Sequence, residues 1–341
     1  MPIGWGIIST GRHPDLKMAP AINASKGSHI AAVMSRDIGR AQAFAAKHNA
    51  SNAVDDVDAL IEDPNVDAVY IASPNFLHAE QTIKAAKAGK HVLVEKPMAL
   101  SIADAEQMIE ACLKFSVTLG VGFHLRAHGA HQAIRELVVN GDLGNIHFAE
   151  TNWGRGVRGQ ESVPPRSGLQ AWWDEPKMIG AGAFMATGVH CVDLLRYALS
   201  DEIIAVNATT DATHAKPLEE FAHLVLEFSR GTIATLMTGR KTPDYYRNEI
   251  GIYGTLGSAY TNSTIDMNQE GSLSIHTDKQ NANMQYEYDP INLYKVQVEA
   301  FESSLISKQD PLATGIDGLR TVEATVAMLE SAKIKAQVKL K

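Results

Sequence analysis

The sequence predicts an α/β protein with two domains: an N-terminal parallel sheet covered by helices, then an α+β domain with a large, mostly antiparallel open sheet. Two observations support this. In the first half, short apolar runs alternate with helical stretches, which is typical of βαβ units. From residue 203 onward, strand-like runs follow one another across Gly-containing turns, as in hairpins. We therefore place the domains at residues 1–125 and 126–341.

The composition argues against several classes of protein. The 341 residues suffice for two domains, and the net charge of −8 is spread without long runs of one sign. Nucleic acid is therefore not expected as a partner. The 13 histidines show no spacing typical of metal ligands, so no metal is expected.

Cysteines and apolar runs predict the compartment. Cys112 and Cys191 are the only cysteines, which argues against disulfides and fits the reducing cytoplasm. The first apolar run, Ile3–Ile8, is too short for a signal peptide, and no apolar stretch approaches the length of a membrane span. We expect a cytoplasmic protein without membrane association.

The first half shows the alternation of a Rossmann-type dinucleotide-binding domain. Residues 3–8 form the first strand, and the turn after it stands where such domains bind the cofactor. Further strands are expected at 31–35 and 66–72 and in the apolar run that ends before Glu95, and helices at 39–48, 57–62 and 77–88. Right-handed crossovers at this spacing build a parallel sheet.

The turn after the first strand matches the G-x-G-x-x-G fingerprint only in part. Ser9, Gly11 and Pro14 stand at the glycine positions, so only the glycine that lets the backbone approach the pyrophosphate is present. A hydroxyl of Ser9 or Thr10 could instead donate to phosphate. We assign Ser9, Thr10, Gly11 and Arg12 to the cofactor, although a turn with one glycine is more often only a turn.

The end of the second strand predicts the choice of cofactor. An NAD site usually offers an acidic residue there to the ribose 2′-hydroxyl, whereas this chain has Ser35 and Arg36. A hydroxyl and a guanidinium suit a 2′-phosphate, so we predict NADP(H) in preference to NAD(H). The alternative is that Arg36 faces solvent and that Asp37 partly cancels its charge.

An ionisable pair follows the expected strand that ends before Glu95. Glu95 and Lys96 come at its carboxyl end, where α/β sheets place their ligands, and Pro97 fixes the exit of the chain. Taken alone, the pair has an ordinary alternative as a surface ion pair that closes a strand.

The second half begins with a capped helix and continues into hairpins. Ser101, with Asp104 three residues on, predicts the start of a helix to about Phe115, with Cys112 as a small core residue. Helices are expected at 130–140, 292–307 and 315–337, and strands at 146–153, 203–209, 221–228, 232–238 and 249–253. One face of the open sheet is left for helices or a partner, so we expect a homo-oligomer, either a dimer or a tetramer.

The long segment 154–170 is glycine-rich and carries Arg155, Arg158 and Arg166. A loop of this length is often functional. If it faces the site, its arginines favour an anionic substrate such as a sugar phosphate or acid. The alternative, slightly favoured for any one arginine, is a surface loop with solvated side chains.

Two motifs together resemble the Gfo/Idh/MocA family of oxidoreductases: Ile-Ala-Ser-Pro-Asn-Phe-Leu-His at 71–78 and Ala-Gly-Lys-His-Val-Leu-Val-Glu-Lys-Pro at 88–97. The similarity continues at 120–126, 180–182, 188–190 and 254–258. It implies that Ser73, Asn75 and His78 line the nicotinamide and its ribose, and that Lys96 reaches both ribose and substrate. On the same resemblance we assign Glu95, Arg126, Trp172 and Tyr294 to the cofactor, and His124, Arg166 and Thr187 to the substrate.

The chemistry implied is hydride transfer between a nicotinamide and a secondary alcohol or ketone, which requires a proton carrier. His190 suits that role because imidazole titrates near neutral pH, and Lys96 would donate a hydrogen bond to the reacting oxygen. Glu95 would hold the cofactor amide or the lysine. A lone histidine in this pattern is otherwise more often a core residue.

Two departures from the family pattern stand out. Ala186 replaces the aspartate that usually precedes the histidine by four residues, and alanine cannot orient an imidazole. Asp193, three residues after His190, is the predicted stand-in, and Thr187 is a weaker one. Trp173 stands where relatives often carry arginine, which leaves Trp172 as the stacking residue.

Three functions remain open at this stage. The first is an NADP(H)-dependent oxidoreductase acting on a sugar or polyol. The second is a redox-neutral hydrolase or epimerase with a tightly bound nicotinamide, and the third is a non-catalytic nucleotide-binding sensor. Net change in reduced cofactor, turnover without net change, or binding without chemistry distinguishes them.

Overall fold

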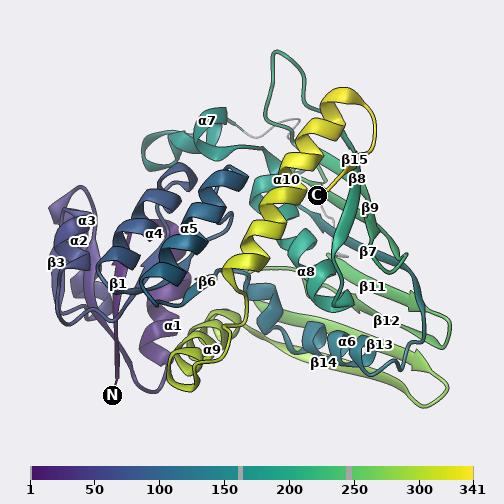
Figure 1. Cartoon of the computed structure of the whole chain (residues 1–341), viewed down its shortest axis with the longest axis horizontal. Coiled ribbons are helices and arrows are strands. Elements are labelled where there is room, and N and C mark those ends of the chain that lie inside the picture. The colour runs from purple at the N-terminus through teal and green to yellow at the C-terminus, as the bar shows by residue number, and fades with distance from the viewer. Residues whose placement is uncertain (1, 160–163, 243–247, 341) are drawn as a thin grey trace. The chain divides into compact units, whose positions relative to one another are not determined.

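The structure, a computed structural model, describes residues 2–159, 164–242 and 248–340, which form two compact units (Figure 1). The first unit comprises Met1–His124 and Pro290–Val322. The second comprises Leu125–Asp289 and Glu323–Lys341. The chain therefore leaves the first unit after His124 and returns to it at Pro290.

The sheet of the first unit has six parallel strands in the order β3-β2-β1-β4-β5-β6, which confirms the predicted Rossmann-type sheet. The strands are β1 (Ile3–Ile8), β2 (Ser28–Met34), β3 (Asn52–Val54), β4 (Ala68–Ile71), β5 (His91–Val94) and β6 (Leu119–Val121). Apolar side chains fill them because both faces of such a sheet are covered. The strand order reverses between β1 and β4, and ligands bind at the carboxyl ends of strands beside such a reversal.

The helices of the first unit include α1 (Ala19–Ala24), α2 (Ile38–His48), α3 (Val57–Ile61), α4 (His78–Lys87) and α5 (Ile102–Lys114). Helices α2, α3 and α5 begin after a residue whose side chain accepts a backbone N–H of the first turn, whereas α1 and α4 have no such cap. The predicted cap of α5 is confirmed, since Ser101 Oγ accepts a hydrogen bond from the Asp104 amide at 3.1 Å. Cys112 lies in the core as predicted, and burial raises the pKa of its thiol to about 12.

Helix α9 (Asn292–Ser307) belongs to the first unit, although the predicted split at residue 125 places it in the second domain. It packs on β1, where the rings of Trp5 and Phe301 lie 5.5 Å apart. Trp5 Nε1 donates to Glu302 Oε1 at 2.8 Å, and Ser25 Oγ donates to Glu302 Oε2 at 3.0 Å. These donors compensate the burial of the Glu302 carboxylate.

The second unit contains a nine-stranded sheet in the order β14-β13-β12-β11-β7-β10-β9-β8-β15. Its strands are β7 (Ile146–Gly154), β8 (Ile203–Thr210), β9 (Phe221–Phe228), β10 (Ile233–Gly239), β11 (Glu249–Gly254), β12 (Gly257–Asn262), β13 (Gln269–Thr277), β14 (Asn281–Asp289) and β15 (Val338–Lys339). β7 and β10 pair in parallel and the other pairs are antiparallel, which confirms the prediction of a mostly antiparallel sheet.

Alternation along the strands gives this sheet one packed face and one open face. In β9, Ala222, Leu224 and Leu226 are fully buried, whereas Val225 between them is 38% exposed. The helices of the second unit are α6 (Gly129–Val139), α7 (Pro176–Ile179) and α8 (Val189–Leu199), and α10 (Gly315–Ile334) runs from the first unit into the second.

One apolar stretch corrects an expectation from the sequence. The segment Pro176–Leu199 is long and apolar enough to cross a membrane by length and composition, although no such stretch was expected. It is divided here into α7, a π-helical turn (Phe184–Gly188) and α8, and 83% of its most apolar window is buried inside the structure. Such burial is typical of a helix in a protein core.

Candidate functional site

Three predicted segments meet at the carboxyl ends of β1, β4 and β5. These are the turn after Ile8, the segment from Ser73 to His78, and the Glu95-Lys96-Pro97 turn. Because the strands are parallel neighbours beside the reversal of strand order, their ends share one edge of the sheet. The first unit thus assembles its predicted cofactor residues at the edge where such folds bind dinucleotides.

The turn after β1 keeps the geometry of the glycine fingerprint without its first glycine. Ser9 has φ of 118°, a left-handed conformation that favours glycine. Its hydroxyl oxygen accepts the amide of Gly11 at 3.1 Å, which compensates part of the strain. The absence of a side chain at Gly11 leaves the backbone there open to close approach by a phosphate. Thr10 and Arg12 flank it in the same turn.

Two hydrogen bonds fix the side chain of Glu95, the neighbour of the predicted catalytic lysine. Its Oε1 accepts a hydrogen bond from Tyr70 Oη at 2.8 Å, and its Oε2 accepts the amide of Lys96 at 3.3 Å. The carboxylate also needs a glycine opposite it, because a Cβ on Gly122 would lie 2.7 Å from Oε1. Burial, followed by the charge of Glu95, raises the pKa of Tyr70, so the phenol keeps its proton for this bond.

His13 extends this chain of hydrogen bonds. Its Nδ1 lies 2.9 Å from Tyr70 Oη. Because the Tyr70 proton is used toward Glu95, His13 Nδ1 is assigned as the donor to the tyrosine oxygen. Burial is the largest cause that lowers the pKa of His13, and the charge of Glu95 opposes it. Neither His13 nor Tyr70 was predicted as a site residue from the sequence, where the place of His13 in the turn after β1 was the one available signal.

Aromatic rings line the same region of the first unit. The ring of Tyr294, in α9, lies edge-on to His13 at 5.1 Å and stacked with His124 at 4.9 Å. Both His124 and Tyr294 are nearly fully buried. The structure therefore brings together two residues that were predicted separately, one for the cofactor and one for the substrate.

The imidazole of His78 lies between the Glu-Lys-Pro turn and the start of its own segment at Ser73. Its Nδ1 lies 2.8 Å from the carbonyl oxygen of Pro97, and its Nε2 lies 2.9 Å from that of Ser73. The Ser73 hydroxyl donates to Gln81 Oε1 at 2.6 Å. Asn75 is buried in the 3₁₀ turn between these residues. In this arrangement His78 ties two of the predicted segments to each other.

The end of β2 places the residues predicted to select the cofactor. Ser35 is buried, and Arg36 is exposed beside it. The carboxylate of Asp37 accepts the amide of Arg40 at 3.1 Å and so caps helix α2. The carboxylate of Asp37 is therefore used to cap the N-terminus of α2.

The second unit presents His190 on the first turn of α8. The imidazole is 3% exposed, and its ring lies 5.3 Å from that of Trp153 in β7. One turn earlier, Ala186 offers no carboxylate. Thr187 donates to the carbonyl of Ala183 at 3.0 Å and shares a hydrogen bond with Thr238.

Asp193 and Arg126 form a buried ion pair. Arg126 Nε and Nη2 lie 2.8 and 2.6 Å from the two carboxylate oxygens of Asp193, and Arg196 lies 3.8 Å away. The guanidinium of Arg126 also lies over the ring of Tyr197, 5.0 Å from its centre. Arg126, which was assigned to the cofactor, and Asp193, which was assigned to catalysis, thus contact each other directly.

Glu219, which the sequence analysis missed, fixes the glycine-rich segment before α8. Its two carboxylate oxygens accept the amides of Gly182 and Phe184, each at 2.8 Å. Burial raises the pKa of Glu219, and these two bonds oppose that rise. Nothing in the local sequence marks this residue, because its partners lie more than thirty positions away.

The predicted loop at 154–170 carries Arg166, and a tryptophan pair follows in the 3₁₀ helix Gly168–Asp174. Trp172 and Trp173 pack on each other at 4.7 Å, and the guanidinium of Arg166 lies 5.6 Å from the centre of the Trp173 ring. Asp174 accepts a hydrogen bond from Arg166 Nη1 at 2.5 Å. Part of this loop, residues 160–163, lies outside the described residues.

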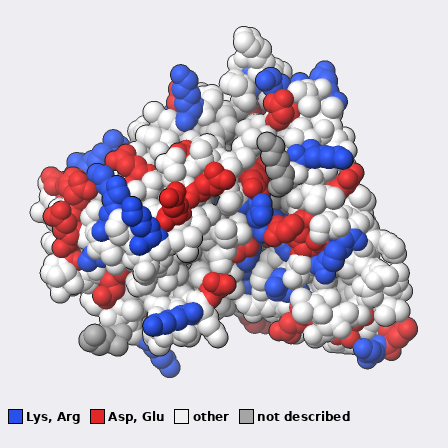
Figure 2. All heavy atoms as spheres, in the orientation of Figure 1, with Lys and Arg blue, Asp and Glu red and all other residues white. Residues whose placement is uncertain are grey.

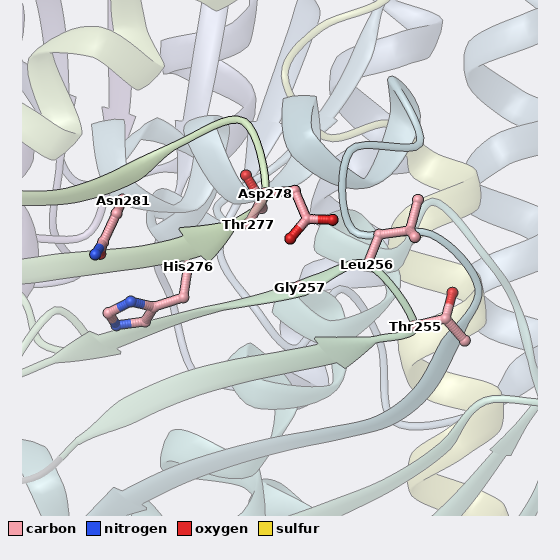
Figure 3. Close-up of a pocket in the computed structure, with 7 residues that line it drawn as sticks. All are labelled: Thr255, Leu256, Gly257, His276, Thr277, Asp278 and Asn281. Carbon is pink, nitrogen blue, oxygen red and sulfur yellow. The ribbon is translucent and has the colours of Figure 1, made fainter.

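A hollow of about 430 Å³ lies elsewhere in the second unit (Figure 3). It is lined by the β11–β12 turn and by the β13–β14 hairpin, with His276 and Asn281 among its residues. None of the predicted site residues lines it. It is a surface feature separate from the residues described above.

Two family models match the chain. An oxidoreductase family with an NAD-binding Rossmann fold, GFO_IDH_MocA, matches residues 3–123. The GFO/IDH/MocA C-terminal domain matches residues 131–260. The matched segments include both the Glu-Lys-Pro turn and His190.

Named relatives are similar over nearly the full length. The 1,5-anhydro-D-fructose reductase of Ensifer adhaerens is 31% identical over 331 residues, which is 96% of this chain and 96% of that protein. The D-xylose 1-dehydrogenase (NADP(+)) 2 of Haloferax volcanii is 28% identical and covers 98% of this chain and 99% of its own. The aldose-aldose oxidoreductase of Caulobacter crescentus, crystallised with glycerol, superposes with a TM-score of 0.88 over 100% of both chains at 24% identity, and so shares the fold.

Proposed function

The chain belongs to the GFO/IDH/MocA family of NAD(P)-dependent oxidoreductases, and from this we propose that it transfers a hydride between NADP(H) and a secondary alcohol or ketone of a sugar or polyol. The observation that carries the proposal is the position of Glu95-Lys96-Pro97 at the carboxyl end of β5, one strand from the reversal of strand order. A surface ion pair, the alternative for this motif, does not explain why the Glu95 carboxylate is buried and bound to Tyr70.

The residues of the first unit fit a dinucleotide. The left-handed turn at Ser9 and the open backbone at Gly11 suit a pyrophosphate, and Ser73 with Asn75 lies at the neighbouring strand end. When bound, the nicotinamide supplies the hydride donor or acceptor. Lys96 donates a hydrogen bond to the reacting oxygen, and the backbone at Lys96 is positioned for this by Glu95.

His190 carries the proton of the reacting oxygen. Imidazole is suited to this because either ring nitrogen can accept or donate near neutral pH. The contact with Trp153 limits the rotation of the ring and keeps bulk water from one of its faces. Asp193 acts through its ion pair with Arg126, which fixes the face of α8 that bears His190.

The preference for NADP(H) is supported by the end of β2. Arg36 offers a guanidinium that matches a 2′-phosphate, and Ser35 offers a hydroxyl beside it. The acidic neighbour that could weaken this effect, Asp37, is used to cap α2.

Ala186 favours a second candidate, a nucleotide-binding sensor without chemistry, and a redox-neutral reaction with a tightly bound nicotinamide is the third. The same experiment separates all three. Purified protein is mixed with NADPH or NADP⁺ and a panel of sugars, ketoses and polyols, and reduced cofactor is followed by absorbance while products are followed by chromatography. Equal loss of cofactor and substrate supports the proposal, whereas product without cofactor change, or binding without product, contradicts it.

We also propose a cytoplasmic homo-oligomer with no membrane or nucleic-acid partner. Charges of both signs are interspersed over the visible surface (Figure 2), and both thiols are buried. On the open face of the sheet in the second unit, Phe148, Ile233 and Tyr260 expose 36%, 40% and 39% of their surface. Light scattering after gel filtration should find a dimer or tetramer, and Ile233→Ser should weaken it. A wild-type monomer at micromolar concentration would contradict this.

A further inference from the structure

Two arginines extend from neighbouring strands at the same edge of the sheet in the second unit. In the parallel pairing of β7 with β10, Trp153 stands opposite Thr238 and Gly154 opposite Gly239. Arg155 follows directly, and its amide donates to the Gly239 carbonyl at 2.8 Å. Arg240 therefore leaves β10 next to Arg155.

This arginine pair borders the surroundings of His190. The guanidinium of Arg155 lies over Trp153, 4.9 Å from the ring centre, and Trp153 contacts the imidazole of His190. On the neighbouring strand, Thr238, two residues before Arg240, shares a hydrogen bond with Thr187, three residues before His190. Arg155 thus contacts a side chain that itself contacts His190. Arg240 lies two residues from a side chain that is hydrogen-bonded to the turn before α8.

The carboxylates that the structure describes near Arg240 have other partners. Glu219 accepts two backbone amides, and Glu220 lies 2.9 Å from Lys241. Asp266 lies 4.0 Å from Arg155, the limit of an ion pair, and both side chains are more than 40% exposed, so that pair is weak. Arg240 Nη2 lies 3.4 Å from the carbonyl oxygen of Gly182, a neutral acceptor.

Among the described residues, the charge of Arg240 is compensated in part by Glu219 and Glu220. Burial lowers its pKa to about 10, and the neighbouring positive charge of Arg166 acts in the same direction. The charges of Glu219 and Glu220 oppose this effect, and that of Arg155 adds to it. Arg166 is already paired with Asp174, whereas Arg155 and the half-buried Arg240 would both be stabilised by an added anion, because the anion lowers their mutual repulsion.

We propose that the substrate of this enzyme carries an anionic group, a carboxylate or a phosphate, and that Arg155 and Arg240 bind it while the reacting carbon lies at His190. The inference rests on the proposed role of His190. Guanidinium groups bind both kinds of anion through paired N–H donors, so the shared chemistry is an oxyanion with two or more acceptor oxygens. Arg240 is a residue that the sequence analysis did not select.

The test compares matched probes on the wild-type protein. D-gluconate supplies a carboxylate, D-glucose 6-phosphate supplies a phosphate, and D-sorbitol is neutral. Their dissociation constants are measured by calorimetry with NADPH present, and inorganic phosphate is titrated alone as a further probe. We expect one of the two anionic probes to bind at least about tenfold more tightly than D-sorbitol, and the better one identifies the anion.

Variants assign that difference to the arginines. Arg155→Gln and Arg240→Gln should each weaken the preferred anion by about tenfold and change D-sorbitol by less than about twofold. Arg240→Lys keeps the charge and should lose less. Arg230→Gln, at the opposite end of β10, removes the same charge from the same unit and should have no effect. If Arg240→Gln fails to fold, Arg155→Gln carries the test, since its side chain is 46% exposed.

The outcomes separate this inference from the proposed function. In one outcome, neutral sugars are turned over with NADPH and the arginine variants behave like the Arg230→Gln control. This result would overturn the proposal of an anionic substrate and leave the proposed oxidoreductase activity intact. Arginine-dependent binding of the anion without any cofactor turnover would support the anion site and contradict the proposed role of His190.

Discussion

The hydroxyl of Tyr70 donates a 2.8 Å hydrogen bond to Glu95 Oε1, and this contact joins the end of β4 to the Glu-Lys-Pro turn after β5. Tyr70 is fully buried and Glu95 is 9% exposed. The second oxygen of Glu95 accepts the amide of Lys96. The direction of the chain at Lys96 is therefore fixed by a carboxylate that is bound on both sides.

Tyr70→Phe should destabilise the protein and slow its reaction. The change keeps the ring and removes the donor, so Glu95 stays buried with one hydrogen bond fewer, at a cost of about 1–3 kcal/mol in the free energy of unfolding. Urea denaturation measures this, and kcat should fall with it. Tyr288→Phe is the control, because that side chain is 62% exposed. Equal stability of the two variants would contradict the account.

His128 predicts how stability depends on pH. The residue is fully buried, its Nε2 donates to the Glu270 carbonyl at 3.0 Å, and its Nδ1 accepts the Ala130 amide at 3.1 Å. This neutral imidazole has both nitrogens in use, and burial lowers its pKa to about 4. Between pH 4 and 6.5 the unfolded chain binds the extra proton, so this part of the stability is complete above pH 6.5 and is lost on acidification.

The predicted slope in that window is about 1.4 kcal/mol per pH unit from His128 alone. The measurement is the free energy of unfolding in urea at a series of pH values, compared with His128→Gln. The difference between the two proteins should grow with pH from 4 to 6.5 and then level off. His214→Gln, an exposed histidine, should keep the wild-type slope. Parallel curves for the wild type and His128→Gln would reject this prediction.

Asp193→Asn should be strongly destabilising. It leaves the buried guanidinium of Arg126 without its charged partner, which costs about 3–5 kcal/mol in buried pairs. Replacing both residues, as Arg126→Met with Asp193→Leu, should restore most of the stability. If Asp193 positions His190, the double variant should regain stability and not kcat. Recovery of both would limit Asp193 to a structural role.

Arg36→Gln should change the affinity for one cofactor only. Loss of a guanidinium that binds a 2′-phosphate should raise the dissociation constant of NADPH by about tenfold or more and leave that of NADH nearly unchanged. Fluorescence titration of the reduced cofactors measures both. Lys26→Gln removes an exposed charge from the same unit and serves as the control. A wild-type protein that binds NADH more tightly would reject the predicted preference.

The sequence predicted those parts of the fold that depend on local patterns. The boundaries of β1 follow from an apolar run and those of α5 from the cap at Ser101, and both agree with the structure within a residue. Strand β14 was missed although its residues 281–289 alternate polar with apolar or aromatic side chains, because they include no β-branched side chain. The return of α9 to the first unit depends on Trp5 and Glu302, which lie 297 positions apart, so local patterns contain no sign of it.

The same distinction applies to the site. Lys96 and Ser9 lie at strand ends, and a strand end can be located from sequence. Tyr70 is an apolar-run residue whose role depends on a carboxylate on the next strand, and Glu219 depends on amides 35 and 37 positions away. Such residues are found only when tertiary contacts are known.

The central claim is that Lys96 and His190 perform the chemistry of an NADP(H)-dependent oxidoreductase. The most direct measurement is the steady-state absorbance change of reduced cofactor with the best substrate of the panel, for the wild type, Lys96→Met and His190→Ala, with NADPH affinity measured in parallel. We expect each variant to lose about a hundredfold or more in kcat while still binding NADPH. Near wild-type kcat in both variants would contradict the account.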